Sequence, residues 1–202
     1  TGSRLMEQEK IEALRKLALT LSSVSDLDLM METILSAARR FVGAQAGSIY
    51  IKEGERPILT YSQNDFFNKR PGRLPYKDQE LALTANSLAG YAARSNRLLN
   101  IDDAYNIPSE SPFRFHPDFD LRTGYVTRSI LTIPLTDIRK SVTGVLQIIN
   151  RLDDNGRTAS FTKDDEELML LFSSTAALAL ERAQLIRQML LRTVKRAELR
   201  DP

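Results

Sequence analysis

Two neighbouring stretches of the sequence have the patterns of β-strands. Residues 120–135 read D-L-R-T-G-Y-V-T-R-S-I-L-T-I-P-L, and residues 144–151 read G-V-L-Q-I-I-N-R. Ser129–Leu135 and Val142–Ile149 are rich in β-branched and aliphatic residues, which favours strands. The polar run Asp137-Ile138-Arg139-Lys140 lies between them and is typical of a turn. We therefore expect two adjacent strands joined by a short turn.

Four further segments have the short apolar runs of strands, which brings the predicted number to six. They are Ala46–Lys52, Ile58–Ser62, Leu81–Leu83 and Leu98–Ile101. The first two flank Glu53-Gly54-Glu55-Arg56-Pro57, so we expect them to form a hairpin. Residues 63–72 are predicted to form a polar loop.

Helical periodicity and capping residues predict helices over residues 5–22, 25–43, 86–94 and 162–198. Ser25-Asp26 and Asn86-Ser87 are N-cap signals, and Gly43 is a C-terminal signal. Residues 102–120 form a long segment without periodicity, a length that is usually functional or disordered in a compact domain. Its four aromatic residues favour a packed lid over a free linker: Tyr105, Phe113, Phe115 and Phe119.

The last predicted helix has two apolar stripes about 100° apart. One stripe consists of Leu168, Leu171, Thr175, Leu178, Arg182, Leu185 and Met189. The other consists of Phe172, Ala176, Ala179, Ala183, Ile186 and Leu190. One stripe can pack on the sheet while the other contacts a partner helix in a coiled coil or bundle. A helix that folds back only on its own domain is the alternative.

Charge and composition restrict the classes of function. The chain has 28 Lys and Arg against 26 Asp and Glu, a net charge of +2, which argues against nucleic-acid binding. A solvated helix face is expected for the C-terminal basic residues, with a polyanion site as the alternative: Arg182, Arg187, Arg192, Lys195, Arg196 and Arg200. There is no Cys and no apolar run near the roughly 18 residues of a membrane span, so we expect a cytoplasmic protein without a span.

Catalytic arrangements are scarce. His116 is the only His, so a Ser-His-Asp triad lacks supporting residues, and a metal centre built on several His is excluded. Asp102-Asp103 and Asp164-Asp165-Glu166 are carboxylate clusters, which we expect in caps or turns rather than in metal or acid-base chemistry. No phosphate-binding glycine motif is present. The sequence predicts that this chain is not an enzyme and has no metal site.

The two opening stretches resemble the GAF domains of cyclic-nucleotide phosphodiesterases and cyanobacterial adenylyl cyclases. S-L-A-G-Y-A-A-R at residues 87–94 and L-N-I-D-D-A-Y at residues 99–105 resemble further segments of that family. The resemblance implies an α+β fold: a six-stranded antiparallel sheet with helices on both faces and long N- and C-terminal helices. It implies a signalling and dimerisation helix at residues 1–24, a GAF domain at 25–180 and a C-terminal signalling helix at 181–202.

The same resemblance implies a pocket beneath the lid for a cyclic nucleotide (cAMP or cGMP) or another small ligand, with no cofactor required. The positions that match the family's ligand contacts are Ser48, Leu88, Ala89, His116, Asp120, Thr123, Thr127 and Gln147. One departure concerns the aromatic residue that stacks on the base. Family members often carry Phe-Asp after the second strand, whereas this chain has Ser62-Gln63 at the nearest equivalent. Either the stacking aromatic is missing, or Tyr61 substitutes for it.

A further family signature, N-K-x(n)-F-x(3)-D-E, is resembled by Asn150, Arg151, Phe161, Asp165 and Glu166, with Arg in place of Lys. We interpret this set as a structural latch in which Arg151 pairs with Asp165 and ties the last long strand to the final helix. Direct ligand contact is the alternative.

The C-terminal run A-E-L-R-D-P at residues 197–202 resembles the entry into HD-GYP metal-dependent phosphohydrolase domains of bacteria. The resemblance implies a covalently linked output domain beyond Pro202. We therefore expect a regulatory sensor that controls this domain through a homodimer of its terminal helices. A ligand-free dimerisation and interaction module is the alternative.

Overall fold

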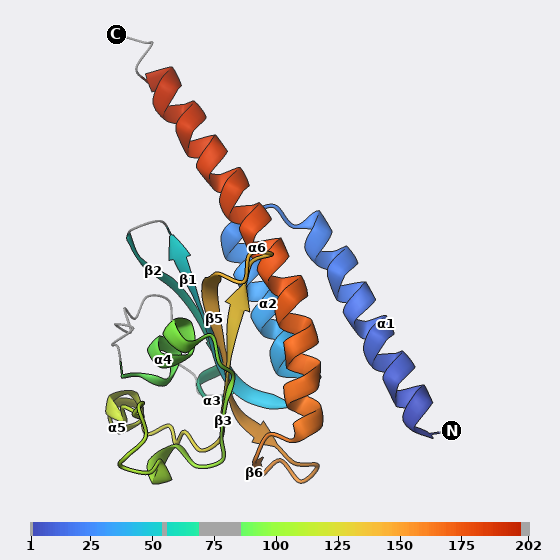
Figure 1. Cartoon of the computed structure of the whole chain (residues 1–202), viewed down its shortest axis with the longest axis vertical. Coiled ribbons are helices and arrows are strands. Elements are labelled where there is room, and N and C mark those ends of the chain that lie inside the picture. The colour runs from blue at the N-terminus through green and yellow to red at the C-terminus, as the bar shows by residue number, and fades with distance from the viewer. Residues whose placement is uncertain (1, 54–55, 69–85, 199–202) are drawn as a thin grey trace.

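An antiparallel β-sheet lies at the centre of the computed structural model, which describes residues 2–53, 56–68 and 86–198 (Figure 1). Within these residues the sheet has six strands: β1 (Ala44–Glu53), β2 (Arg56–Asn64), β3 (Leu99–Ile101), β4 (Ile130–Thr136), β5 (Val142–Leu152) and β6 (Thr158–Ala159). Their order is β2-β1-β5-β4-β3, and β6 pairs with β5. The predicted α+β class, with a six-stranded antiparallel sheet, is confirmed.

Helices cover both faces of the sheet (Figure 1). One face carries the three long helices α1 (Gly2–Ser23), α2 (Leu27–Phe41) and α6 (Lys163–Glu198). The opposite face carries α4 (Leu88–Ser95), with α3 (Asp65–Asn68) and α5 (Asp118–Thr123) packed at its side. The long terminal helices that the sequence predicts are therefore present.

Strand periodicity separates two cores. Along β1, Ile49 and Ile51 point toward α2 and α6, while Ser48 and Tyr50 point toward α4. On the long-helix side, Phe172 of α6 is fully buried, and its ring meets that of Phe41 edge to face at 5.7 Å. This apolar side stabilises the fold, and the α4 side contains the polar residues described below.

Local capping explains where the helices begin. The Asp26 carboxylate accepts a hydrogen bond from the Leu29 amide at 2.8 Å, and the Ser87 hydroxyl accepts one from the Gly90 amide at 3.0 Å. Both predicted N-caps are confirmed. Gly43 follows α2 with φ of +62°, a conformation that glycine adopts without strain.

Two details differ from the sequence-based expectations, and one expectation is not tested. The predicted loop at residues 63–72 begins instead as strand and helix, because β2 continues to Asn64 and α3 follows. The Asn64 side chain accepts a hydrogen bond from the Phe66 amide at 3.0 Å, which starts that helix. The expected strand Leu81–Leu83 lies outside the described residues. The sixth observed strand is β6, whose two residues are too few to show a period.

The lid, residues 102–120, packs through its aromatic side chains, as predicted. It contains a 3₁₀ turn at Ala104–Asn106 and the beginning of α5. The Tyr105 ring lies 5.1 Å from that of Phe115, and the Phe113 ring lies 5.2 Å from that of Tyr91 on α4.

The two stripes of α6 have different surroundings. Phe172, Ala176 and Ala183 are buried against the domain, whereas the other stripe leaves four large apolar side chains exposed by half or more: Leu171, Leu178, Leu185 and Met189. Among the described helices, α6 is long and apolar enough to cross a membrane, judged by length and composition alone. Core helices of soluble proteins meet the same criterion, and 39% of that window is buried inside this fold.

Candidate functional site

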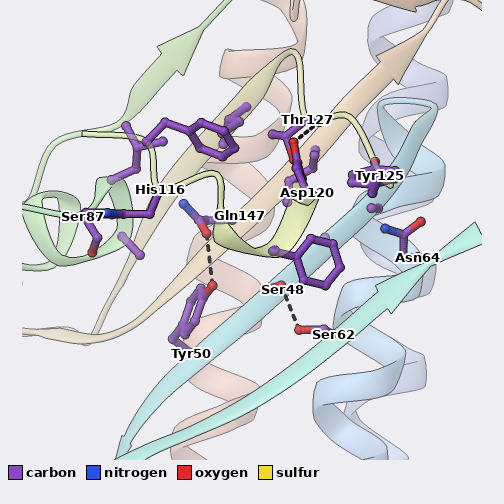
Figure 2. A pocket seen from close by; sticks show the side chains of 18 of the residues that line it. Ser48, Tyr50, Ser62, Asn64, Ser87, His116, Asp120, Tyr125, Thr127 and Gln147 are labelled. Atoms are coloured by element: carbon purple, nitrogen blue, oxygen red, sulfur yellow. Dashed lines mark hydrogen bonds between the residues drawn. The ribbon is translucent and has the colours of Figure 1, made fainter. Parts of the chain in front are cut away.

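A cavity of about 150 Å³ lies between the sheet and the lid (Figure 2). Its floor comes from β1, β2, β5 and the first residue of β4, and its other walls come from α4, the lid and α5. The lining residues are Ala46, Gly47, Ser48, Tyr50, Ser62, Gln63, Asn64, Ser87, Leu88, Ala89, Arg114, Phe115, His116, Phe119, Asp120, Tyr125, Thr127, Ile130, Gln147 and Ile149.

The floor carries a row of polar side chains that crosses four strands. Ser62, Ser48, Gln147 and Thr132 are successive cross-strand neighbours on β2, β1, β5 and β4. The Ser48 and Ser62 hydroxyls lie 2.8 Å apart, and the Gln147 amide donates to the Thr132 hydroxyl at 3.2 Å. The row therefore consists of two hydrogen-bonded pairs side by side on the lid face of the sheet, and Ser62, Ser48 and Gln147 of this row line the cavity.

Tyr50 lies two residues after Ser48 on β1 and therefore on the same face of the sheet as this row. Its hydroxyl donates to the Gln147 carbonyl oxygen at 3.2 Å (Figure 2). Burial raises the pKa of Tyr50 to about 12, so its hydroxyl stays protonated at neutral pH. Tyr50 and Thr132 together hold the Gln147 amide in one orientation, with one N–H free for another acceptor.

Asp120 closes the wall of the cavity opposite the floor. Its carboxylate accepts hydrogen bonds from the Thr127 amide at 2.6 Å, the Thr127 hydroxyl at 2.9 Å and the Tyr105 hydroxyl at 2.8 Å. Burial and the hydrogen bond to Asp120 both raise the pKa of Tyr105. Asp120, itself only 4% exposed, thus joins the 3₁₀ turn, α5 and the segment leading into β4.

One end of the cavity suits an anion. Leu88 and Ala89 begin α4, and the first amides of a helix have no acceptor within the helix. His116 also lines the cavity and lies near Ser87, the N-cap of α4 (Figure 2). Arg114 also lines the cavity, but its guanidinium donates to the carbonyl oxygens of Ser109, Ser111 and Phe113. Arg114 therefore holds its own loop in place.

Aromatic side chains form the apolar side of the cavity. Phe115, Phe119 and Tyr125 line it, and the Phe119 ring contacts that of Tyr125 at 6.1 Å. Tyr61, the substitute for the missing stacking residue, is wrong for this role. It neighbours Ser62 on β2 and therefore points to the opposite face, where it packs against the long-helix core.

Seven of the eight predicted ligand positions line the cavity, and their role as contacts stays a prediction: Ser48, Leu88, Ala89, His116, Asp120, Thr127 and Gln147. Thr123 does not line it. Because Thr123 is the last residue of α5, its hydroxyl donates back to the Phe119 carbonyl at 2.7 Å. Sequence reasoning missed Tyr50, Ser62 and Thr132. Strand alternation indicates that Tyr50 shares a face with Ser48, but the cross-strand register requires the structure.

The predicted latch residues meet where β5 approaches α6. The Arg151 Nε lies 2.9 Å from the Asp165 carboxylate, and the two side chains form an ion pair. The Nε–H of Arg151 does not point at the carboxylate, so this contact is not a hydrogen bond. Asp165 also accepts from the Thr162 amide at 2.8 Å, and the Thr162 hydroxyl accepts from the Asp165 amide at 3.2 Å. This reciprocal pair is a capping box at the start of α6.

Asn150 connects the latch to the segment below the lid. Its side chain donates to the Tyr125 hydroxyl at 2.9 Å and the Val126 carbonyl at 2.8 Å, and accepts from the Arg128 amide at 2.7 Å. It is 2% exposed and has φ of +56°, which Asn tolerates better than most residues. The latch thus joins residues 125–128, which follow the lid, to the sheet and to α6. Its part in signalling stays a prediction.

Glu166 ties β3 to α6, and the contact predicts a pH dependence. Lys163 donates to its carboxylate at 2.7 Å and Asn100 at 2.8 Å, and these bonds lower the pKa of Glu166 below its ordinary value of 4.5. Since the folded pKa is the lower one, the stabilisation is complete above pH 4.5 and is lost as the pH falls through the folded pKa.

We expect Glu166→Gln to lose about 1 kcal/mol at pH 7 and nothing at pH values below the folded pKa. Thermal unfolding of both proteins from pH 7 to pH 3 measures this. The matched control is Glu167→Gln, because Glu167 is the exposed next residue. Parallel melting curves for wild type and Glu166→Gln across this range would contradict the assignment.

Among the described residues, no three His, Asp or Glu side chains gather as a potential metal site. The carboxylate pair at residues 102–103 contributes to a turn instead. Asp103 accepts hydrogen bonds from the Tyr105 amide at 3.0 Å and the Asn106 side chain at 2.7 Å, which lower its pKa. The cap interpretation therefore holds for Asp103 as well as for Asp165.

Comparisons with known proteins agree with this geometry. A family model described as GAF domain matches residues 26–180. A curated protein, the probable 3',5'-cyclic phosphodiesterase pde-5 of Caenorhabditis elegans, is 28% identical over 167 residues. That alignment covers 80% of this chain and 21% of the relative, so the chain spans about a fifth of the relative's length.

Two solved structures illustrate the similarity of fold. The GAF domain of an Acinetobacter phosphoenolpyruvate-protein phosphotransferase has a TM-score of 0.61 at 16% identity, covering 88% of this chain and 95% of that one. The free methionine-R-sulfoxide reductase of Neisseria meningitidis, solved with its substrate, has a TM-score of 0.59 at 12% identity, covering 87% and 90%. At these identities the likeness concerns the fold alone.

Proposed function

This chain belongs to the GAF domain family, a family of regulatory small-molecule sensors, and on that premise we propose that it binds a cyclic nucleotide, cAMP or cGMP, in the cavity beneath the lid. The observation that carries the proposal is the combination of an anion-binding end with a polar floor and an aromatic side. Similarity to a probable 3',5'-cyclic phosphodiesterase supports the ligand class.

Each part of the cavity has a role in the proposal. The amides of Leu88 and Ala89 bind the cyclic phosphate, and His116 contacts it from the lid. Ser48 and the free N–H of Gln147 contact the base from the floor. Asp120 and Thr127 hold the lid over the ligand, so binding and lid closure favour each other.

Calorimetry with cAMP, cGMP and cyclic di-GMP tests the proposal on the purified chain. We expect measurable heat for cAMP or cGMP, and at least about tenfold weaker binding to Gln147→Leu, which removes a polar contact with the base. Gln188→Leu, an exposed change on α6, is the matched control and should bind like wild type. Absence of binding by all three nucleotides overturns the cyclic-nucleotide proposal.

A ligand-free interaction module is the second candidate, and one observation favours it. Apart from one N–H of Gln147, the polar side chains of the floor and of the Asp120 wall already bond to one another through Ser48–Ser62, Tyr50–Gln147–Thr132 and Asp120–Thr127. A module that only joins its neighbours needs no further ligand. It predicts no heat in the calorimetry and no change in oligomeric state when nucleotides are added.

The proposed route of the signal is a homodimer through the terminal helices. The exposed stripe Leu171, Leu178, Leu185 and Met189 supplies its apolar seam. Light scattering measures the expected dimer mass, and Leu178→Glu with Leu185→Glu should give monomers. Monomeric wild-type protein at micromolar concentration would contradict this route.

The domain that this sensor regulates is also part of the proposal. Because residues 197–202 resemble the entry into HD-GYP phosphohydrolases, we propose that α6 regulates such a domain and that this chain itself is non-catalytic and cytoplasmic. Hydrolysis of cyclic di-GMP by the full-length protein, measured with and without cAMP or cGMP, tests the link. A rate of cyclic di-GMP hydrolysis that neither cAMP nor cGMP changes contradicts this link.

A further inference from the structure

The C-terminal end of α1 is capped by a residue of α6. A helix end leaves its last carbonyl oxygens without partners, and the last turn of α1 has no Lys, Arg or His. The Ser22 and Ser23 hydroxyls donate to the carbonyls of Leu19 and Thr20. The carbonyls of Leu21, Ser22 and Val24 accept hydrogen bonds from Arg182, which lies 158 to 161 residues further along the chain.

Arg182 suits this position in charge and shape. Its guanidinium places a positive charge at the negative end of the α1 dipole, and its planar fork reaches several carbonyls at once. The bond to the Ser22 carbonyl is 2.8 Å and that to the Val24 carbonyl is 2.7 Å. The interpretation of Arg182 as part of a solvated basic face is therefore wrong, because its side chain binds α1.

The other polar contact of α1 is weak, and its apolar contact lies mainly in the C-terminal half of the helix. Lys10 and Asp164 form an exposed ion pair at 3.9 Å, of a kind that contributes little to stability. Leu17 and Leu21 are buried, whereas Ile11 and Leu19 on the same helix are more than half exposed. In Figure 1, α1 lies on the outer side of α6, and its C-terminal end approaches α6 near the middle of that long helix.

Both partners of this contact flank the family match at residues 26–180. The Arg182 Nε is buried without a hydrogen-bond partner among the described residues, which costs free energy. We propose that Arg182 is a positioning residue that couples the two terminal helices, so that a displacement of α6 either carries the end of α1 with it or releases α1. This role requires no ligand and is separate from the cavity.

Hydrogen exchange measured by mass spectrometry on the whole chain tests the coupling. In Arg182→Met we expect amides of residues 8–24 to exchange at least about tenfold faster, with exchange in β4 and β5 unchanged. Arg182→Lys keeps the positive charge but loses the planar guanidinium. Its α1 amides should therefore exchange more slowly than those of Arg182→Met and faster than those of wild type. Arg192→Met, on the exposed end of α6, is the matched control and should match wild type.

A distance measurement gives a second readout. The chain has no Cys, so spin labels at Lys16→Cys and Gln188→Cys report the separation of the two helices directly. We expect one narrow distance distribution, which broadens when Arg182→Met is added. Unchanged α1 protection, or faster exchange that extends equally through β4 and β5, overturns the proposal, since the residue would then be dispensable or only globally stabilising.

Discussion

Asp120→Ala is expected to remove about 3 kcal/mol of unfolding free energy and at least about 99% of the affinity for nucleotide. The change leaves the amide and hydroxyl of Thr127 without their acceptor, although Thr127 is only 4% exposed. It also removes the acceptor of the Tyr105 hydroxyl. An unpaired buried donor costs more than an ordinary hydrogen bond contributes, so the lid should loosen before the sheet does.

Thermal unfolding, hydrogen exchange of residues 104–127 and calorimetry measure the three effects of this change. A loss of about 3 kcal/mol corresponds to a fall of roughly 6–12 °C in melting temperature for a chain of this size. Asp118→Ala is the matched control, because Asp118 is an exposed carboxylate on the same short helix. If both variants behave alike, Asp120 does not hold the lid.

Asp165→Ala is expected to destabilise the fold by a similar amount, about 3 kcal/mol. The change removes the acceptor of the Thr162 amide, which is half of the capping box, and leaves Arg151 without its ion pair. The Asp165 and Arg151 side chains are only 12% and 27% exposed, so water compensates poorly for the lost partner. Chemical denaturation measures the loss.

A double substitution distinguishes the ion pair from the cap. Arg151→Met with Asp165→Leu removes both charges, and we expect it to recover more than half of the loss, since apolar replacement of a buried pair is often neutral. Asp164→Ala is the control, because the Asp164 side chain is 71% exposed and should change stability by less than about 0.5 kcal/mol. If the double variant is as unstable as Asp165→Ala, the whole loss of stability comes from the capping box and none from the ion pair.

The site shows where sequence reasoning succeeds and where it stops. The family motif predicts that Ser48, Gln147 and Asp120 share one pocket, and all three line the cavity. The same motif misplaced Thr123, because the helix ends at that residue and turns its hydroxyl back to the backbone. It also suggested Tyr61 as the residue that stacks on the base. Tyr61 neighbours Ser62 on β2, and adjacent residues of a strand point to opposite faces of the sheet, so Tyr61 points away from the cavity.

The features that are predictable from sequence patterns are local. The caps at Asp26 and Ser87 join residues three apart, and the strands β4 and β5 follow from their own composition and the turn between them. These interactions depend on few neighbours, so pattern and spacing suffice to predict them.

Contacts between distant segments depend on the folded arrangement of the whole domain. The polar row on the cavity floor depends on the register of four strands, and the bond from Tyr50 to Gln147 spans 97 residues. Arg182 follows the apolar spacing of its helix, yet it caps a helix that ended more than 150 residues earlier. Spacing indicates which face a residue occupies, but packing between segments determines which groups meet on that face.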